Sequence, residues 1–284
     1  MAIAYLNGAW TAPSDAKISV FDRGFMFGDG VYEVMPVYGG KIFTKTAHLE
    51  RLARSLREIR LTTRFSEDDW SQLLDQAVVK AGEDNALIYL QVTRGVAPER
   101  SHAYLAAEPT VLITVTPFTP NNEQDIVSLR VCTKEDFRWH RADIKVTSLI
   151  ANGMIKNEAL AEGYHDAIMV RAGFVTEATS SNVFMVVDSE IMTPPKSELL
   201  LHGITREEVI RIAQGLDLKV KECEVQASAL EGADEVWLSA TGMEVQPIGE
   251  INGMQVGDGK PGPIWRQMFR AFQDEKQKAI ECID

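Results

Sequence analysis

The sequence has few cysteines and lacks any recognisable targeting or membrane-spanning segment. Its three cysteines, Cys132, Cys223 and Cys282, are odd in number and show no C-x-x-C spacing, which favours neither a disulfide framework nor a zinc site. The N-terminus lacks a basic region followed by an apolar stretch, so it does not resemble a signal peptide. No stretch approaches the roughly 20 apolar residues of a membrane span. We therefore expect a cytoplasmic protein.

Several motifs of nucleotide-dependent, metal-dependent and hydrolytic enzymes are also missing. Gly28 and Gly30 form G-x-G, but Glu33 stands where the dinucleotide fingerprint has its third glycine. There is no P-loop, no H-E-x-x-H and no G-x-S-x-G. The histidines lie far apart in the sequence, which argues weakly against a helical metal site. With 29 basic and 41 acidic residues the net charge is −12, which disfavours nucleic acids and anionic membranes as partners.

What is present is the composition of a globular protein large enough for two domains. Hydrophobic residues make up 45% and charged residues 25% of the 284 residues. The segment PFTPNNEQD (117–125) contains two prolines and two asparagines and has little to bury, which is typical of a boundary. We expect an N-terminal α+β domain over 1–118, a linker over 119–126, and a C-terminal α/β domain over 127–284.

The first part of the chain alternates strand and helix signals. Two β-rich stretches, 31–37 and 41–43, flank Gly39 and Gly40, which predicts a hairpin. Apolar residues at three- and four-residue spacing then predict a helix, and further strands follow at 87–93 and 111–116. The apolar positions of that helix are Leu49, Leu52, Leu56 and Ile59.

The second part shows the β/α alternation of an α/β domain. Strands are predicted over 127–133, near Ala167, near Val183 and over 235–238. Helices are predicted over 150–162 and 206–214. An amphipathic closing helix carries Ile264, Trp265, Met268, Phe269 and Phe272, which we interpret as core residues.

Four segments together carry a family resemblance. They are DRGFMFGDGVYEV (22–34), RADIK (141–145), TEATSSNVF (176–184) and LHGITRE (201–207). In this order they resemble the class IV, fold-type IV aminotransferases, which use pyridoxal 5'-phosphate (PLP), and within that family the D-amino acid enzymes most of all. The resemblance implies a homodimer of two-domain subunits, with a smaller N-terminal α+β domain and a larger C-terminal α/β domain. It places the cofactor in the cleft between them.

Lys145 is the residue that the resemblance identifies as the catalytic, cofactor-binding lysine. It lies among apolar neighbours, Ile144 and Val146, just before a predicted helix that looks buried. Burial disfavours an ammonium and lowers its pKa from about 10.4. A neutral amine attacks an aldehyde, which is the reaction that attaches PLP. The sequence shows a permissive setting, and the resemblance supplies the role.

Glu177 is implied to pair with the pyridine nitrogen of PLP and keep it protonated, so that the ring withdraws electrons. We expect it in a turn between 174–175 and 183–184. Thr179, Ser180, Ser181 and Asn182 are expected to donate hydrogen bonds around it, although such a polar run also suits an ordinary turn. Ala178 departs from the glycine expected after the glutamate.

The phosphate of PLP is implied to bind at a helix N-terminus. The run TREE (205–208) matches a capping box, which predicts that Thr205 caps a helix ending near Gly215. Free amides and the helix dipole attract an anion there. The resemblance assigns the phosphate to Ile204 and Thr205, to Arg51 of the first-domain helix and to Thr241 of SATG.

A last group concerns the substrate. The stretch QVTRGVAPERSH (91–102) resembles the D-amino acid enzymes, so that Arg100, His102 and Tyr32 are implied to bind the substrate carboxylate. A guanidinium binds a carboxylate through two parallel hydrogen bonds. In the family this loop reaches the active site of the neighbouring subunit. Glu99 is an extra residue before the arginine.

The sequence thus predicts a transaminase that moves the amino group of a D-amino acid, such as D-alanine or D-glutamate, to 2-oxoglutarate or pyruvate. Four alternatives remain open. A branched-chain L-amino acid aminotransferase shares the lysine, glutamate and phosphate motifs. An (R)-amine transaminase accepts an amine without a carboxylate, and aminodeoxychorismate lyase uses the same scaffold. A non-catalytic binding protein is the least favoured, because the motifs persist together.

Overall fold

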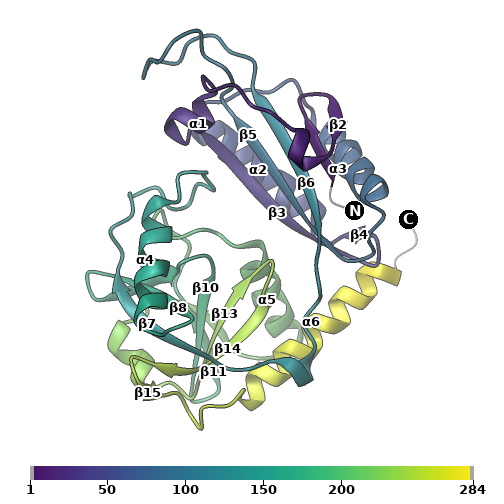
Figure 1. Cartoon of the computed structure of the whole chain (residues 1–284). Helices are drawn as coiled ribbons and strands as arrows, with labels where there is room; N and C mark the ends of the chain where they lie inside the picture. Colours follow the sequence, from purple (N-terminus) through teal and green to yellow (C-terminus); the bar gives the residue numbers. More distant parts are fainter. Residues whose placement is uncertain (1–2, 282–284) are drawn as a thin grey trace. The chain divides into compact units, whose positions relative to one another are not determined.

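The computed structural model describes residues 3–281, which form two compact units (Figure 1). The first unit contains residues 3–120, 144–148 and 278–281, and the second contains 121–143 and 149–277. Both combine helices with a sheet, which confirms the mixed α/β class expected from the sequence. The segment that contains Lys145 joins the first unit, whereas the sequence pattern alone had grouped it with the C-terminal domain. Cys282 lies outside the described residues.

The first unit is built on a six-stranded antiparallel sheet with helices α2 and α3 (Figure 1). The order of the strands is β2-β1-β6-β5-β3-β4. The strands are β1 (Ile3–Leu6), β2 (Ala9–Thr11), β3 (Gly30–Tyr38), β4 (Lys41–Ile42), β5 (Ala86–Thr93) and β6 (Thr110–Pro117). The helices are α1 (Arg23–Phe27), α2 (Lys45–Glu58), α3 (Glu67–Ala81) and the short η1 (Pro13–Asp15).

The predicted elements of this unit are confirmed, and one long helix was missed together with β1, β2, η1 and α1. The β3–β4 hairpin turns through Gly39 and Gly40, both with positive φ. Helix α2 buries Leu49, Leu52 and Leu56. The missed helix is α3, although Ser66 opens it with a capping box in which Asp69 is the partner.

Residues 144–148 lie along β3 as an added piece of extended chain. Val146 forms a bridge with Val31, and the backbone amide of Tyr32 donates to the carbonyl of Lys145 at 3.0 Å. The amide of Thr147 donates to the carbonyl of Gly30 at 3.0 Å. These bonds fix the backbone of Lys145 to strand β3.

The second unit is built on a nine-stranded mixed sheet with the order β12-β11-β10-β13-β14-β7-β8-β9, and β15 pairs with β14. Parallel pairing joins β14 to β7, β7 to β8 and β11 to β12. The strands are β7 (Leu129–Glu135), β8 (Asp166–Arg171), β9 (Phe174–Ala178), β10 (Asn182–Val187), β11 (Glu190–Thr193), β12 (Val220–Glu222), β13 (Glu235–Ala240), β14 (Glu244–Ile251) and β15 (Met254–Gln255).

Three helices belong to this sheet, and their positions confirm those predicted from periodicity. They are α4 (Ile150–Ala161), α5 (Ile204–Gly215) and α6 (Pro263–Glu281), with 3-10 turns η2 (Glu123–Asp125) and η3 (Ala227–Gly232). In α6 the predicted apolar face is buried through Trp265, Met268, Phe269 and Phe272. Helix α4 differs from expectation, because only Ile155 and Ala159 are buried while Ile150 is 80% exposed.

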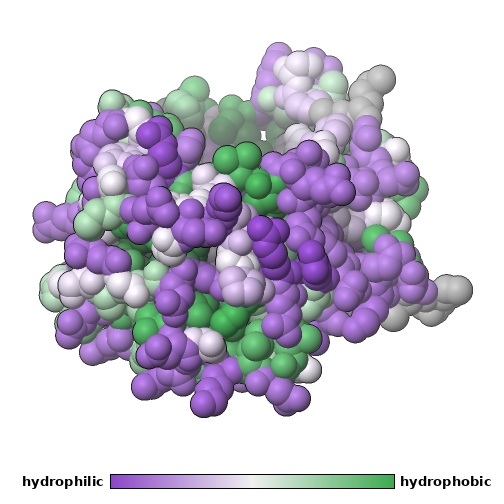
Figure 2. Space-filling model, turned by 90° about the horizontal axis from the view of Figure 1, so that it is seen from below, coloured by the Kyte–Doolittle hydropathy of each residue, from purple (hydrophilic) through white to green (hydrophobic). Residues whose placement is uncertain are grey.

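The surface is mixed in polarity. Hydrophilic residues cover much of the face shown in Figure 2, and hydrophobic residues gather in several patches between them. None of the helices within residues 3–281 is both long and apolar enough to cross a lipid bilayer.

Candidate active site

The predicted site residues fall into two groups, one in each unit, and each group has its own geometry. In the first unit, Lys145 is half-buried and its Nζ lies 4.2 Å from the centroid of the Tyr32 ring. Tyr32 in turn lies against Tyr89, with ring centroids 5.5 Å apart. An aromatic face stabilises an ammonium at this distance. The structure therefore brings together the predicted cofactor lysine and one predicted substrate residue.

Arg51 is buried and held by a carboxylate that the sequence had not singled out for this role. Its Nε and Nη2 donate to Oε1 and Oε2 of Glu33 at 2.8 and 2.7 Å. His48 Nδ1 lies 2.8 Å from Oε2 of the same glutamate. Burial alone would raise the pKa of Glu33, but Arg51 and His48 together lower it to about 2. Arg51 thus presents a fixed, charged guanidinium inside the unit.

Arg100 and His102 lie on the β5–β6 loop (residues 94–109), and both are exposed. Phe27, at the end of α1, contacts both residues. The Arg100 guanidinium lies 5.0 Å from the centroid of the Phe27 ring, and the His102 ring lies 5.5 Å away at an interplanar angle of 74°. The structure therefore groups the two predicted carboxylate-binding side chains around one aromatic ring.

In the second unit, Glu177 lies in strand β9 and is buried, so the prediction that it sits in a turn was wrong. Its Oε2 accepts hydrogen bonds from the amide of Leu201 at 3.1 Å and from Asn182 Nδ2 at 3.4 Å. Arg138 Nη1 donates to Oε1. Burial raises the pKa of Glu177, and the attraction of Arg138 opposes that rise.

Arg138 contacts a predicted site residue, and the sequence reasoning had not singled it out. Its Nε and Nη2 each donate to the buried Asp136 at 2.9 Å, while Nη1 reaches Glu177. Asp136 also accepts from Arg171 Nη2 at 3.0 Å and from the Thr176 hydroxyl at 2.7 Å. The only sequence signal was a D-x-R pattern just before RADIK, and nothing in that pattern indicates a partner in β9.

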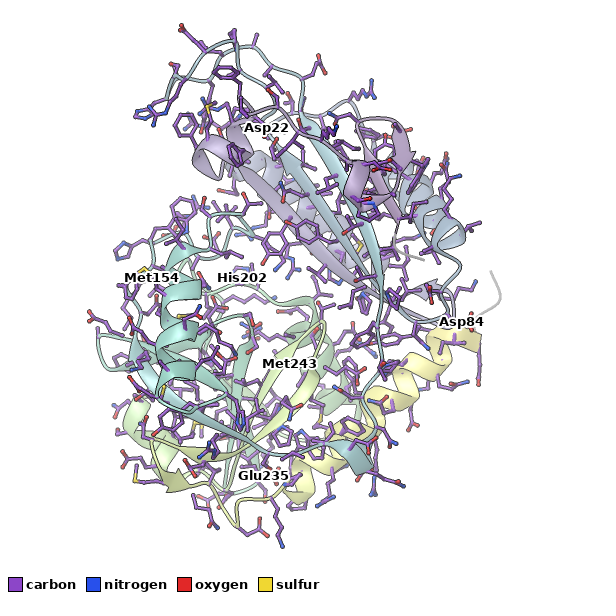
Figure 3. The ribbon with its side chains drawn as sticks, in the orientation of Figure 1. Asp22, Asp84, Met154, His202, Glu235 and Met243 are labelled. Carbon is purple, nitrogen blue, oxygen red and sulfur yellow. The ribbon has the colours of Figure 1, made fainter. Side chains whose placement is uncertain are left out.

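Helix α5 begins at Ile204, and its N-cap is Gly203 without a side-chain hydrogen bond. The predicted capping box was therefore wrong, and Thr205 is the second residue of the helix. The amides of Ile204 and Thr205 consequently belong to the first turn, whose N–H groups have no partner within the helix. His202, labelled in Figure 3, directly precedes the N-cap Gly203. A Cβ at Gly203 would lie 2.1 Å from Asn182 Oδ1, so glycine is required there.

The polar run after Glu177 is only partly directed toward it. Asn182 contacts Glu177 and also donates to the carbonyl of Leu201 at 2.9 Å. Thr179 instead donates to Asp166 at 2.6 Å, and Ser180 is exposed. The Ser181 hydroxyl is buried and has no hydrogen-bond partner among residues 3–281. Ser239 in β13 has a similar orphaned hydroxyl, two residues before Thr241.

Each unit carries groups whose chemistry fits part of PLP. In the first unit, the Lys145 amine fits the aldehyde and the Arg51 guanidinium fits the phosphate. In the second unit, the Glu177 carboxylate fits the protonated ring nitrogen, and the first-turn amides of α5 fit an anion. The orphaned hydroxyls of Ser181 and Ser239 leave buried donors for a bound group.

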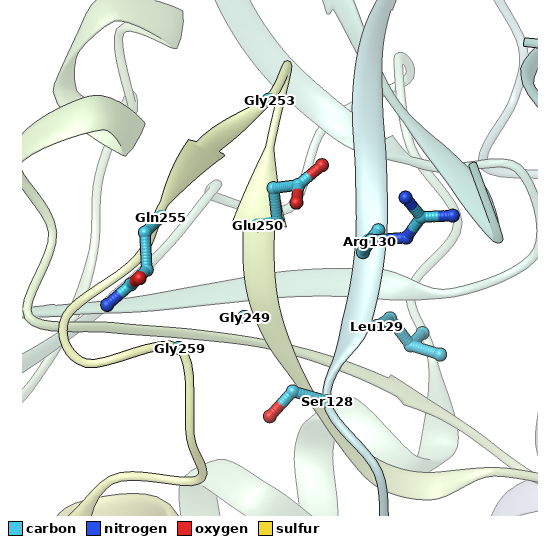
Figure 4. Close-up of a pocket in the computed structure, with 8 residues that line it drawn as sticks. All are labelled: Ser128, Leu129, Arg130, Gly249, Glu250, Gly253, Gln255 and Gly259. Atoms are coloured by element: carbon cyan, nitrogen blue, oxygen red, sulfur yellow. The ribbon is translucent and has the colours of Figure 1, made fainter. Parts of the chain in front are cut away.

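A separate cavity of about 330 Å³ lies in the second unit and contains none of the predicted site residues (Figure 4). It is formed where β7 and β14 run side by side. Residues Ser128, Leu129, Arg130, Gly249, Glu250, Gly253, Gln255 and Gly259 line it.

The fold is that of enzymes that transfer amino groups. The family model described as amino-transferase class IV matches residues 30–251. The chain belongs to the class IV aminotransferases, as the resemblance in the sequence had implied.

The relatives named as D-alanine aminotransferase agree with this assignment. One from Listeria monocytogenes serotype 1/2a is 39% identical over 277 residues and covers 96% of both chains. One from Staphylococcus haemolyticus is 37% identical over 274 residues, covering 96% of this chain and 97% of its own. Among solved structures, the branched-chain aminotransferase of Thermoproteus uzoniensis superposes with a TM-score of 0.87 at 27% identity, covering 98% of this chain and 94% of that one.

Proposed function

We propose that the protein is a PLP-dependent transaminase that moves the amino group of a D-amino acid to a 2-oxo acid. D-alanine or D-glutamate would be the donor, and 2-oxoglutarate or pyruvate the acceptor. The observation that carries the stereochemical assignment is the grouping of Arg100 and His102 on one loop around Phe27. The relatives named as D-alanine aminotransferases support the same assignment.

Bound PLP supplies an aldehyde that accepts the amino group and a ring that withdraws electrons from the substrate. Lys145 would hold the cofactor through Nζ. The same amine would take the proton from the substrate α-carbon as general base and would donate it, as general acid, to the carbon that carried the aldehyde. The Tyr32 ring, 4.2 Å from Nζ, keeps the amine in position.

Glu177 keeps a proton on the ring nitrogen, and this role requires its carboxylate to be ionised. Burial opposes ionisation, since it raises the pKa of Glu177. The buried guanidinium of Arg138 counters that effect, and the Leu201 amide adds a hydrogen bond at 3.1 Å. Arg138 is thus proposed to maintain the charge on which the ring chemistry depends.

The phosphate is proposed to bind Arg51, the first-turn amides of Ile204 and Thr205, and Thr241. Glu33 holds the Arg51 guanidinium in place by accepting two hydrogen bonds from it. Ser180, Ser181 and Asn182 complete the proposed cofactor-binding set. Of these, Ser181 has a buried hydroxyl without a hydrogen-bond partner in the part of the chain that the structure describes.

The carboxylate of the donor is proposed to bind Arg100, His102 and Tyr32. We also propose a homodimer in which the β5–β6 loop serves the neighbouring subunit. In support, the N-cap and first turns of α4 expose the large apolar side chains of Leu149, Ile150 and Met154 (Figure 3). Exposed apolar areas mark protein interfaces. Phe137 and Trp139 are further exposed apolar residues of this unit. A cytoplasmic location remains the prediction from cysteine usage.

Transamination of branched-chain L-amino acids is the second candidate. The structural similarity to the branched-chain aminotransferase of Thermoproteus uzoniensis favours it, because that enzyme shares the fold over nearly the whole chain. The two candidates differ in the stereochemistry of the amino donor. Activity measured with paired D- and L-amino acids therefore distinguishes them.

The test is a panel of paired D- and L-amino acids with 2-oxoglutarate and PLP-loaded enzyme. We expect kcat/KM for D-alanine to exceed that for L-alanine and L-leucine by about 1000-fold, because the carboxylate site orients only one hand productively. Arg100→Met should reduce kcat/KM for D-alanine by about 100-fold. Transamination of L-leucine without reaction of D-alanine would contradict the proposal.

A further inference from the structure

A buried arginine outside the proposed site holds the β5–β6 loop. Arg23 lies in α1, and its side chain is 4% exposed. Its Nη1 donates to the carbonyl of Ser101 and, at 3.3 Å, to that of Ala103, while Nη2 donates to the carbonyl of His102 at 3.5 Å. Three consecutive carbonyls, directly after Arg100, therefore converge on one guanidinium.

A second arginine extends this anchor to the far side of the loop. Asp29 Oδ2 accepts from Nε of Arg23 and from Nε of Arg94, each at 2.8 Å. The Arg94 guanidinium stacks on the Tyr104 ring at 3.6 Å from its centroid. Arg94 also donates to the carbonyl of Ile59 at 2.7 Å. The Asp29 carboxylate therefore binds both arginines. Arg23 donates to the loop backbone, and Arg94 stacks on the Tyr104 side chain of the loop.

The base of the loop is closed by backbone contacts. Gly95 has φ +89°, and a Cβ there would lie 1.8 Å from the carbonyl oxygen of Glu108. The amide of Arg23 donates to the carbonyl of Gly95 at 2.9 Å. Helix α1 therefore contacts the loop at its base through the Arg23 backbone and near its tip through the Arg23 side chain. The N-cap of this helix is Asp22, labelled in Figure 3.

Phe27 links this anchor to the proposed carboxylate-binding pair. The Arg23 guanidinium lies 4.8 Å from the centroid of the Phe27 ring, on which Arg100 and His102 also lie. We propose that Arg23 is a positioning residue for donor recognition, and this rests on the proposed function of Arg100 and His102. An exposed loop of this length would otherwise lose conformational entropy each time it ordered on a substrate carboxylate. Arg23 orders it in advance, because the five N–H groups of a guanidinium satisfy several carbonyls at once.

The test compares Arg23→Met with Arg23→Lys in the PLP-loaded full chain. We expect Arg23→Met to raise KM for D-alanine about 10-fold while kcat changes less than about twofold, since a disordered loop weakens carboxylate binding more than proton transfer. Arg23→Lys should recover part of the loss, because one ammonium keeps the pair with Asp29 but cannot reach three carbonyls. The matched control is Arg57→Met, which removes an exposed guanidinium from α2 and should leave KM unchanged.

Two readouts separate positioning from general damage. Hydroxylamine reacts with the bound cofactor as an amine without a carboxylate, so its rate should be the same in Arg23→Met and in the unsubstituted enzyme. Amide hydrogen exchange in the peptide over 96–109 should become about 10-fold faster in Arg23→Met. Should Arg23→Met fail to fold, Tyr104→Ala, which removes an exposed ring, tests the same anchor and should raise KM for D-alanine in the same direction.

Each negative outcome has a distinct meaning. An unchanged KM for D-alanine in Arg23→Met, when Arg100→Met raises it, overturns the positioning role alone. Equal losses in kcat, KM and hydroxylamine reactivity also overturn it, because they indicate a general structural role. Normal KM for D-alanine in Arg100→Met overturns the proposed function of that arginine instead.

Discussion

Arg138 donates a hydrogen bond from Nη1 to Oε1 of Glu177, and both side chains are buried. Burial raises the pKa of Glu177, and the neighbouring guanidinium opposes that rise. Asp136 holds the other edge of the same guanidinium through two hydrogen bonds of 2.9 Å. The contact couples the charge of Glu177, the proposed partner of the ring nitrogen, to a residue that does not need to touch the cofactor.

Replacing Arg138 by methionine should therefore shift the pH dependence of activity. Without the guanidinium, burial raises the pKa of Glu177 further, so the carboxylate protonates at a higher pH. We expect kcat to fall about 10- to 100-fold and the acid limb of the kcat profile to move to higher pH. Arg130→Met, which removes an exposed arginine from β7, is the control. A lower kcat with an unmoved acid limb would contradict this role.

Glu33 should make stability depend on pH at the acid end. Its folded pKa is about 2 against an ordinary value of 4.5, so the stabilisation is present above about pH 4.5 and lost as the pH falls toward 2. Glu33→Gln should flatten this fall and cost about 3 kcal/mol at pH 7, because Arg51 loses its charged partner. The measurement is the free energy of unfolding from urea titrations between pH 7 and 3. Asp75→Asn, at an exposed pair with Lys45, should change the slope little.

Gly203→Ala should weaken cofactor binding. The added Cβ would lie 2.1 Å from Asn182 Oδ1 and would displace either Asn182 or the start of α5. We expect the Kd for PLP to rise about 10-fold or more, because misplaced amides bind the phosphate less well. Gly215→Ala at the other end of α5 has open space around its Cβ and serves as the control. Equal PLP affinity in both variants would show that the helix start tolerates the change.

Lys276 and Glu244 should behave as a buried pair. Lys276 Nζ lies 2.6 Å from Glu244 Oε1, and both residues are buried. Lys276→Met should cost about 3–5 kcal/mol, because it leaves a buried carboxylate without its cation. Adding Glu244→Gln should recover part of this cost. Chemical denaturation of the two single variants and the double variant gives the coupling energy, and additive losses would contradict the pairing.

The elements that the sequence predicted are those with strong local periodicity. The β3–β4 hairpin follows from Gly39 and Gly40, and α2 follows from its apolar spacing. Helix α3 has an equally clear pattern, including Trp70 and the Ser66 capping box, and could have been predicted in the same way. Family resemblance was needed for the site, since the local chemistry of Lys145 alone shows only a suitable setting.

The remaining features depend on contacts that no local pattern contains. Arg138 meets Glu177 across 39 positions of sequence. Thr205 had the residue type of a cap, but the helix begins two residues earlier than that cap implies, with Gly203 as N-cap close against Asn182. The anchoring of the β5–β6 loop likewise joins Arg23 to carbonyls that are 78 to 80 positions away.

The most direct test of Lys145 as the cofactor lysine is borohydride reduction of the PLP-loaded protein, followed by peptide mapping. The reduction fixes the cofactor on the amine that carries it. We expect one stoichiometric label on Lys145, together with loss of activity, and no label in Lys145→Ala. A label on any other lysine, or an unlabelled Lys145 in active enzyme, would contradict this role.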